Sequence, residues 1–399
     1  MNPIQQINAL GQSIWYDNVS KSLIESGELQ RLVDKGVTGV TSNPTIFEKA
    51  IAGSADYDAG ISELTVVGAG TKDIYESLAI ADIGHGADIL LPVYRQTDGA
   101  DGFISLEVSP LLAHDSAGSI AEGKRLYSRL DRPNVMIKIP ATPEGLPAIR
   151  ALSGAGINVN VTLIFDVEQY TGVINAYMAG IEDLIAAGGN PHHVASVASF
   201  FVSRVDGAID PVCSPALQGK AAIANARLAY VKFQEMFISP RWQALAAKGA
   251  RAQRPLWAST GTKNPKYSDV MYVDNLIGAL TVNTVPPATL TAILDHSVAK
   301  LTISEGVGSA ILEIGQLAGE NILMHDVAQK LQNDGVASFA KSFDSLMASI
   351  DAKRIMFQQK HGVVSAAHEA DKDAAHTATL VNGMRAHASG DMQNHSEVF

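Results

Sequence analysis

The most informative stretch of this chain is VMIKIPATPEGLPAIR, residues 135–150. Its first part is short, apolar and β-branched, and Pro140 closes it, so the pattern predicts a buried strand that ends in a turn. Lys138 interrupts this apolar run. Burial removes hydration that favours the ammonium form, so a buried lysine can offer a neutral, nucleophilic amine. Alternatively, the side chain reaches the strand end and pairs with a carboxylate. The stretch alone leaves both interpretations open.

Similar apolar runs recur on both sides of this strand and alternate with segments of helical spacing. The runs predicted as strands are residues 13–17, 37–43, 103–108, 135–141, 157–165, 194–202, 255–260 and 279–285. The segments predicted as helices are residues 2–12, 20–35, 45–52, 71–86, 116–130, 145–154, 167–188 and 219–238. Eight strands separated by helices indicate a parallel sheet that closes into a (β/α)8 TIM barrel. An open doubly wound sheet is the competing fold, but no glycine-rich dinucleotide loop follows an early strand.

The strand pattern ends near residue 290. Four later segments have helical spacing: residues 289–300, 309–323, 325–333 and 335–359. Because a barrel needs one helix after its eighth strand, we expect residues 1–300 to form the barrel and residues 301–399 to form a C-terminal helical extension packed on it. Residues 361–399 hold five of the eleven histidines at wide spacing, which predicts a partly disordered tail rather than a metal site.

Composition narrows the class of protein. The chain has 399 residues, of which 46% are hydrophobic and 18% charged, as in ordinary globular proteins. A net charge of -11 argues against binding to nucleic acid, although a pocket can still be locally positive. The single cysteine, Cys213, cannot form an intramolecular disulfide, which favours a reducing compartment. The N-terminus lacks a signal-peptide pattern, and no apolar run is long enough to span a membrane. We therefore expect a cytoplasmic monomer or homodimer without a membrane partner.

Polar residues stand at the predicted strand ends, where barrel enzymes place their chemistry. These residues are Asp17, Asn43, Glu107, Lys138, Asn160, Thr162, Ser199, Arg204, Ser259, Lys263 and Asn283. Asp17, Glu107 and Lys138 lie within or directly after apolar runs, so a barrel would bring them to one pocket. A neutral lysine adds to a ketone and forms a Schiff base, which allows the adjacent carbon–carbon bond to break. Two carboxylates in different surroundings can divide the proton transfers that this chemistry needs.

The groups that follow the sixth and seventh predicted strands suit a phosphate. Arg204 offers a planar fork of donors, Lys263 a point charge and Ser259 a neutral donor. A single arginine after a strand is also common in surface ion pairs, so Arg204 alone does not identify a phosphate site.

Two segments resemble the signatures of the transaldolase family. GVTSNPTIF, residues 39–47, resembles the first signature, which is centred on T-[ST]-N-P. VMIKIPATPEGLPAIRAL, residues 135–152, resembles the second, which contains a Schiff-base lysine and a following T-x-x-G. Weaker similarity runs from about residue 13 to residue 285, and the extended C-terminus resembles that of the longer bacterial-type members.

The resemblance implies a (β/α)8 enzyme that needs no metal or organic cofactor. Such an enzyme moves a dihydroxyacetone unit from sedoheptulose 7-phosphate to glyceraldehyde 3-phosphate, giving erythrose 4-phosphate and fructose 6-phosphate. By resemblance, Lys138 forms the Schiff base and Asp17 takes the proton from the C4 hydroxyl during cleavage. Glu107 serves carbinolamine dehydration through a water held with Thr162.

The resemblance also assigns the residues that bind the sugar phosphate. Asn43 and Ser199 bind the hydroxyls of the dihydroxyacetone part, with Asn160 as a neighbour, and Arg204 holds the phosphate. After the seventh strand, many members have A-S-F-R-N, whereas this chain has ASTGTKN at residues 258–264. The arginine is absent, so we infer that Ser259 and Lys263 take its place.

Two other functions remain possible on the sequence. One is an aldolase that releases the three-carbon unit; the related short aldolases usually carry a tyrosine where Glu107 stands, which favours transfer. The other is a catalytically silent barrel that senses sugar phosphates, and the complete set of Asp17, Glu107 and Lys138 argues against it.

Overall fold

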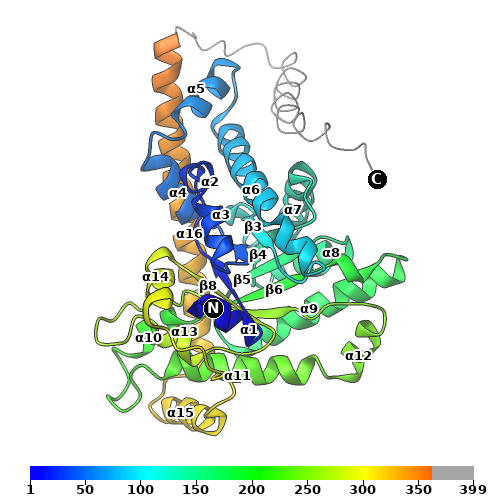
Figure 1. Cartoon of the computed structure of the whole chain (residues 1–399), viewed down its shortest axis with the longest axis vertical. Helices are drawn as coiled ribbons and strands as arrows, with labels where there is room; N and C mark the ends of the chain where they lie inside the picture. The colour runs from blue at the N-terminus through cyan, green and yellow to red at the C-terminus, as the bar shows by residue number, and fades with distance from the viewer. Residues whose placement is uncertain (362–399) are drawn as a thin grey trace.

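The computed structural model describes residues 1–361, in which eight parallel strands close into a barrel in chain order. The strands are β1 (Gln12–Tyr16), β2 (Gly39–Val40), β3 (Phe103–Glu107), β4 (Val135–Pro140), β5 (Val159–Ile164), β6 (Ser196–Phe201), β7 (Arg254–Ala258) and β8 (Thr281–Val285). Helices surround this barrel (Figure 1). The predicted (β/α)8 class is confirmed. Within residues 1–361, no helix combines the length and the apolar character that crossing a membrane requires.

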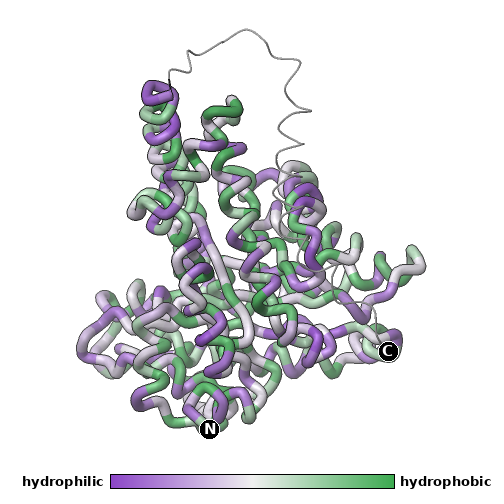
Figure 2. Tube along the Cα trace, turned by 45° about the horizontal axis from the view of Figure 1, so that its top comes forward, coloured by the Kyte–Doolittle hydropathy of each residue, from purple (hydrophilic) through white to green (hydrophobic). Residues whose placement is uncertain are grey.

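The helices vary widely in length. They are α1 (Pro3–Ala9), α2 (Lys21–Glu25), α3 (Glu28–Asp34), α4 (Pro44–Ala52), α5 (Asp58–Val66), α6 (Thr71–Gln96), η1 (Pro110–Leu112), α7 (Ser116–Leu130), α8 (Gly145–Gly154), α9 (Val167–Ala186), η2 (Pro191–His193), α10 (Ser203–Ile209), α11 (Ala221–Met236), α12 (Pro240–Ala246), α13 (Met271–Asn275), α14 (Pro287–His296), α15 (Val307–Gly319) and α16 (Met324–His361). Hydrophobic and hydrophilic residues alternate along the outer helices, as expected for helices with one buried face (Figure 2).

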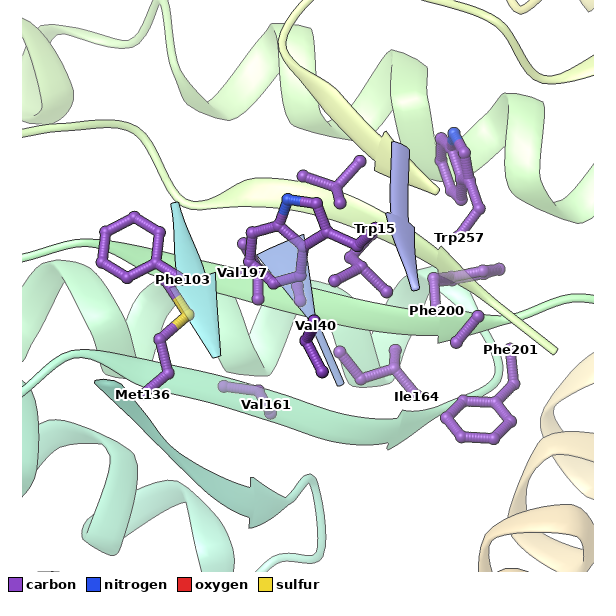
Figure 3. Packing of buried hydrophobic residues seen from close by; sticks show 14 of the residues in the cluster. Trp15, Val40, Phe103, Met136, Val161, Ile164, Val197, Phe200, Phe201 and Trp257 are labelled. Carbon is purple, nitrogen blue, oxygen red and sulfur yellow. The ribbon is translucent and has the colours of Figure 1, made fainter. Parts of the chain in front are cut away.

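The core lies within the barrel and between the barrel and its helices. Strand residues are almost all buried because a parallel sheet covered by helices is enclosed on both faces. Figure 3 shows Trp15 near the centre of this packing, with Phe103 on one side and Trp257 on the other. Gly39 makes room for Trp15, since a Cβ at this glycine would lie 2.5 Å from the indole ring.

Two predictions in the N-terminal quarter are wrong in detail. The single helix predicted over residues 20–35 is divided into α2 and α3, because Gly27 adopts a left-handed conformation with φ of 73°. The predicted strand at residues 37–43 pairs only over β2, and the rest of it leads into Asn43, which caps α4.

The short helices α5, α10, α12 and α13 were not predicted.

Two helix boundaries predicted at glycines are also wrong. The helix predicted to end at Gly86 continues through α6 to Gln96. The helices predicted at residues 325–333 and 335–359 form one helix, α16, which passes through Gly335. Gly335 is a packing position rather than a break, because a Cβ there would lie 2.8 Å from Leu163 Cδ2.

Helix α16 lies across the carboxyl end of the barrel and then runs beside α4 and α5 (Figure 1). Its side chains form polar contacts along this course. The hydroxyl oxygen of Ser342 lies 2.9 Å from that of Thr45. Asp351 accepts a 2.7 Å hydrogen bond from the Thr71 hydroxyl. Lys353 forms an ion pair with Asp58, with 2.6 Å between the charged atoms. The division of the chain near residue 300 stays a prediction, and the predicted disordered tail lies outside the described residues.

Candidate active site

The strand register brings Lys138 beside Glu107. In the β3–β4 ladder Glu107 is opposite Lys138, and in the β4–β5 ladder Lys138 is opposite Asn160. Lys138 Nζ lies 3.6 Å from Glu107 Oε2, and each side chain is 5% exposed. This distance exceeds a hydrogen bond. Lys138 Nζ instead donates a 3.0 Å hydrogen bond to the carbonyl of Ser42. Both interpretations of this lysine thus share one geometry, a buried amine next to a carboxylate.

The T-x-x-G of the second signature shapes the end of β4. Thr142 Oγ1 donates to the carbonyl of Ala113 at 2.6 Å and accepts from the backbone N–H of Gly145 at 3.0 Å. Gly145 opens α8 and packs against β4, because a Cβ there would lie 2.0 Å from the carbonyl oxygen of Pro140. The signature therefore fixes the turn that holds the strand carrying Lys138.

Asp17 follows β1 and is held by the first signature. Its Oδ1 accepts a 2.6 Å hydrogen bond from Thr41 Oγ1, and the Thr41 hydroxyl also lies 2.6 Å from that of Thr284. Burial raises the pKa of Asp17, whereas the charge of Lys138 and the hydrogen bond from Thr41 act to lower it. A carboxylate in this setting is a stronger base than an exposed aspartate.

Glu107 and Thr162 each have a buried oxygen free for another group. Burial raises the pKa of Glu107 to about 7, with the charge of Lys138 opposing the shift. Glu107 Oε2 and Thr162 Oγ1 are buried and form no hydrogen bond within residues 1–361. Buried polar atoms are normally hydrogen-bonded, so these two are placed to bind a water or a substrate atom.

A cavity of about 590 Å³ opens at the carboxyl end of the barrel. Eight of the ten predicted site residues line it: Asp17, Asn43, Lys138, Thr162, Ser199, Arg204, Ser259 and Lys263. Its size suits a sugar phosphate, since ligand pockets typically measure about 300–1,000 Å³. The structure thus brings together predicted residues from six of the eight strand ends.

Two predicted residues do not line this cavity. Asn160 is fully buried, and it bonds Ser199 Oγ at 2.7 Å and Ser105 Oγ at 2.9 Å. It therefore orients Ser199 rather than facing the open space. Glu107 faces a separate, water-sized space of about 20 Å³ on the side of Ser109 and Glu122.

The cavity also carries positive charge, from Arg204 and Lys263. The Arg204 guanidinium lies 5.1 Å from the centre of the Phe201 ring, and burial lowers the pKa of Arg204 while Asp17 opposes this shift. The arginine remains a cation at neutral pH. Ser259 adopts a left-handed φ of 56°, and its hydroxyl lies 3.0 Å from that of Ser203. Strain of this kind is common where a side chain is aimed into a site.

A family model described as transaldolase/fructose-6-phosphate aldolase matches residues 14–350. The chain belongs to this family. It is 47% identical over 372 residues to "Transaldolase 2" of Nostoc, covering 88% of this chain and 98% of the relative. It is 46% identical over 350 residues to "Transaldolase" of Neisseria meningitidis, covering 88% and 100%, and 46% identical over 355 residues to that of Thermobifida fusca, covering 87% and 96%.

Family membership extends through most of α16, and this helix supplies site residues that the sequence did not reveal. Gln332 donates 3.0 Å hydrogen bonds to the carbonyls of Ala141 and Leu163, and Phe339 lines the cavity. No local pattern marks either residue. Thr41 was also missed as the partner of Asp17, although it is the first residue of the T-[ST]-N-P signature.

Proposed function

We propose that the protein is a transferase that acts as a transaldolase. It moves a dihydroxyacetone unit from sedoheptulose 7-phosphate to glyceraldehyde 3-phosphate and yields erythrose 4-phosphate and fructose 6-phosphate. The observation that carries this proposal is the buried Lys138, 3.6 Å from Glu107, in a cavity that Asp17 also lines. The transaldolase names of the relatives support it.

The first half of the reaction forms a covalent adduct. Lys138 Nζ attacks the C2 ketone of the donor and gives a carbinolamine. Glu107, whose pKa of about 7 lets it give and take a proton near neutrality, protonates the departing hydroxyl through a water. Thr162 Oγ1 is the second group that binds this water. Loss of water leaves a protonated Schiff base, which withdraws electrons from the bond between C3 and C4.

The second half breaks and reforms a carbon–carbon bond. Asp17 takes the proton of the C4 hydroxyl, the C3–C4 bond breaks, and erythrose 4-phosphate departs. The electron pair remains on the three-carbon unit bound to Lys138. That unit attacks the aldehyde of glyceraldehyde 3-phosphate, Asp17 returns its proton to the new hydroxyl, and water releases fructose 6-phosphate.

The remaining lining residues bind the substrate. Asn43 and Ser199 would contact hydroxyls of the dihydroxyacetone unit, and their place in the lining of the same cavity as Lys138 supports this assignment. Arg204, Ser259 and Lys263 would hold the phosphate, with Lys263 in place of the family's arginine. One phosphate site serves donor and acceptor, since both carry their phosphate at the end remote from the reacting carbon.

The Schiff base supplies the electron sink for this reaction, so the proposed mechanism needs no metal or organic cofactor. Sugar phosphates are its proposed partners. The monomeric or homodimeric state stays a prediction. A cytoplasmic location is proposed from the single Cys213, which suits a reducing compartment.

A coupled assay tests transfer against release. Fructose 6-phosphate and erythrose 4-phosphate should give sedoheptulose 7-phosphate and glyceraldehyde 3-phosphate, with little free dihydroxyacetone. An aldolase would instead release dihydroxyacetone from fructose 6-phosphate alone, at a rate that matches transfer. That result would overturn the proposed transferase reaction.

A further inference from the structure

Phe339 places an aromatic ring from α16 against the catalytic amine. Its ring centre lies 6.0 Å from Lys138 Nζ, and the residue is 4% exposed. The other lining residues of the cavity fall between residues 17 and 287, on the barrel strands and the loops and helices that follow them. The helix that lies beyond the eighth strand thus contributes one apolar wall directly at the site of adduct formation.

The position of this ring is fixed by the residues around it on the same helix face. Gln332, Gly335, Phe339 and Ser342 follow one another at intervals of three or four residues, which places them on one side of α16. Gln332 is 2% exposed and bonds the carbonyls at the ends of β4 and β5. Gly335 lets the helix approach Leu163, and Ser342 contacts Thr45. Contacts on either side of Phe339 along this helix face therefore fix the position of its ring.

The distance between the Phe339 ring and Lys138 Nζ determines whether the ring contacts an intermediate bound to the lysine. A carbon bonded to Nζ on the side of the ring would lie within van der Waals range of Phe339, about 3.5–4.5 Å. After cleavage, the three-carbon unit on Lys138 carries a reactive electron pair with two possible fates. It attacks an aldehyde, which forms a carbon–carbon bond and completes transfer. Alternatively, it takes a proton from water; hydrolysis of the resulting Schiff base then adds water to C2, breaks the C–N bond and releases free dihydroxyacetone.

We propose that Phe339 is a specificity-determining residue that favours transfer over release by covering the three-carbon unit against water. This inference rests on the proposed function. An apolar ring in contact with the intermediate displaces water from that face, whereas the acceptor aldehyde enters from the open cavity. The ring does not take part in proton transfer.

Truncation of the ring tests this role. Phe339→Ala should raise the ratio of dihydroxyacetone release to transfer by about tenfold or more, the range expected when apolar contact in a pocket is lost. Release is measured from fructose 6-phosphate alone, and transfer is measured with erythrose 4-phosphate present. Phe339→Leu, which keeps apolar bulk, should stay near the wild-type ratio, and Phe339→Val should be intermediate. The series remains informative if the alanine variant does not fold.

Leu346→Ala is the matched control. Leu346 is fully buried on α16, two turns after Phe339, and lines neither cavity, so its variant disturbs the same helix but should keep the wild-type ratio. If Phe339 variants that still form an adduct at Lys138 keep the wild-type ratio of release to transfer, the role of Phe339 is overturned, whereas the proposed function stands. An equal rise in Leu346→Ala would also overturn the role of Phe339, because general loosening of α16 would then be the cause. Absence of transfer in the wild type would overturn the proposed function itself.

Discussion

Lys138 Nζ lies 3.6 Å from Glu107 Oε2 across neighbouring strands, with both side chains 5% exposed. Parallel strands in register place these residues opposite each other, so the pairing follows directly from the β3–β4 ladder. A buried acid and a buried amine at this distance can both hydrogen-bond to one water that lies beside them, and this water can carry a proton between them. This relationship links the fold to the chemistry of the site.

Glu107→Gln should lower kcat by about 10²–10⁴-fold, the usual loss when a general acid–base group is removed. It should also change how stability depends on pH. The pKa of Glu107 is about 7 in the folded protein and about 4.5 when exposed, so the folded state binds the extra proton between these values. The stability that this protonation provides is lost as the pH rises through 7.

The glutamine side chain stays neutral, so the variant lacks this loss. The free energy of unfolding of Glu107→Gln, measured with urea, should therefore increase relative to that of the wild type as the pH rises from about 5 to 8. Curves that run parallel over this range would contradict the raised pKa of Glu107.

Asp17→Asn should separate adduct formation from turnover. The amide cannot take the C4 hydroxyl proton, so kcat should fall by about 10²–10⁴-fold, whereas Lys138 should still form its adduct with fructose 6-phosphate. Quenched-flow assays and mass spectrometry measure the two quantities. Thr41→Val keeps the carboxylate but removes its hydrogen-bond donor, so its loss should be smaller. Normal turnover in Asp17→Asn would rule out the proton-transfer role.

Lys263→Ala should raise KM for phosphorylated substrates. Loss of one charge-assisted contact weakens binding by about 1.5–3 kcal/mol, or roughly tenfold or more in KM, while kcat changes little. Lys266→Ala is the control, because Lys266 belongs to the same loop but does not line the cavity. If KM is the same in both variants, Arg204 is the main phosphate ligand and Lys263 does not replace the family's arginine.

Gly145→Ala should lower the free energy of unfolding by about 1–3 kcal/mol, because its Cβ would overlap the carbonyl oxygen of Pro140 and force β4 or α8 to move. Urea titration measures the change. Gly172→Ala in α9 is the control; the nearest atom to its Cβ is at 3.5 Å, so this variant should be neutral or more stable by about 0.5–1 kcal/mol. Equal stability of the two variants would show that the close approach is tolerated.

The sequence predicted the parts of this structure that depend on local pattern. Apolar runs located all eight strands, because a barrel strand is buried on both faces and reads as a continuous hydrophobic segment. Lys138 and Glu107 were recognisable because each is a charged residue within such a run. Their meeting at 3.6 Å needed only the parallel register.

Features that depend on tertiary contact were not predictable. The last helix was predicted to begin at Gly335, yet this glycine packs against Leu163 within a continuous helix. Asn160 was expected near the substrate, but it is buried in hydrogen bonds to Ser105 and Ser199 and does not line the cavity. Phe339 resembles any apolar helix residue, and only the path of α16 across the barrel brings it to Lys138.

The proposed mechanism depends on a covalent adduct at Lys138. Borohydride reduction in the presence of fructose 6-phosphate, followed by peptide mass spectrometry, tests it most directly. We expect one dihydroxyacetone or ketose adduct on Lys138 and none in Lys138→Arg, because a guanidinium stays protonated and does not add to a carbonyl. An active wild-type enzyme without an adduct on Lys138, or with the adduct on another lysine, would contradict the role of Lys138 as the Schiff-base residue.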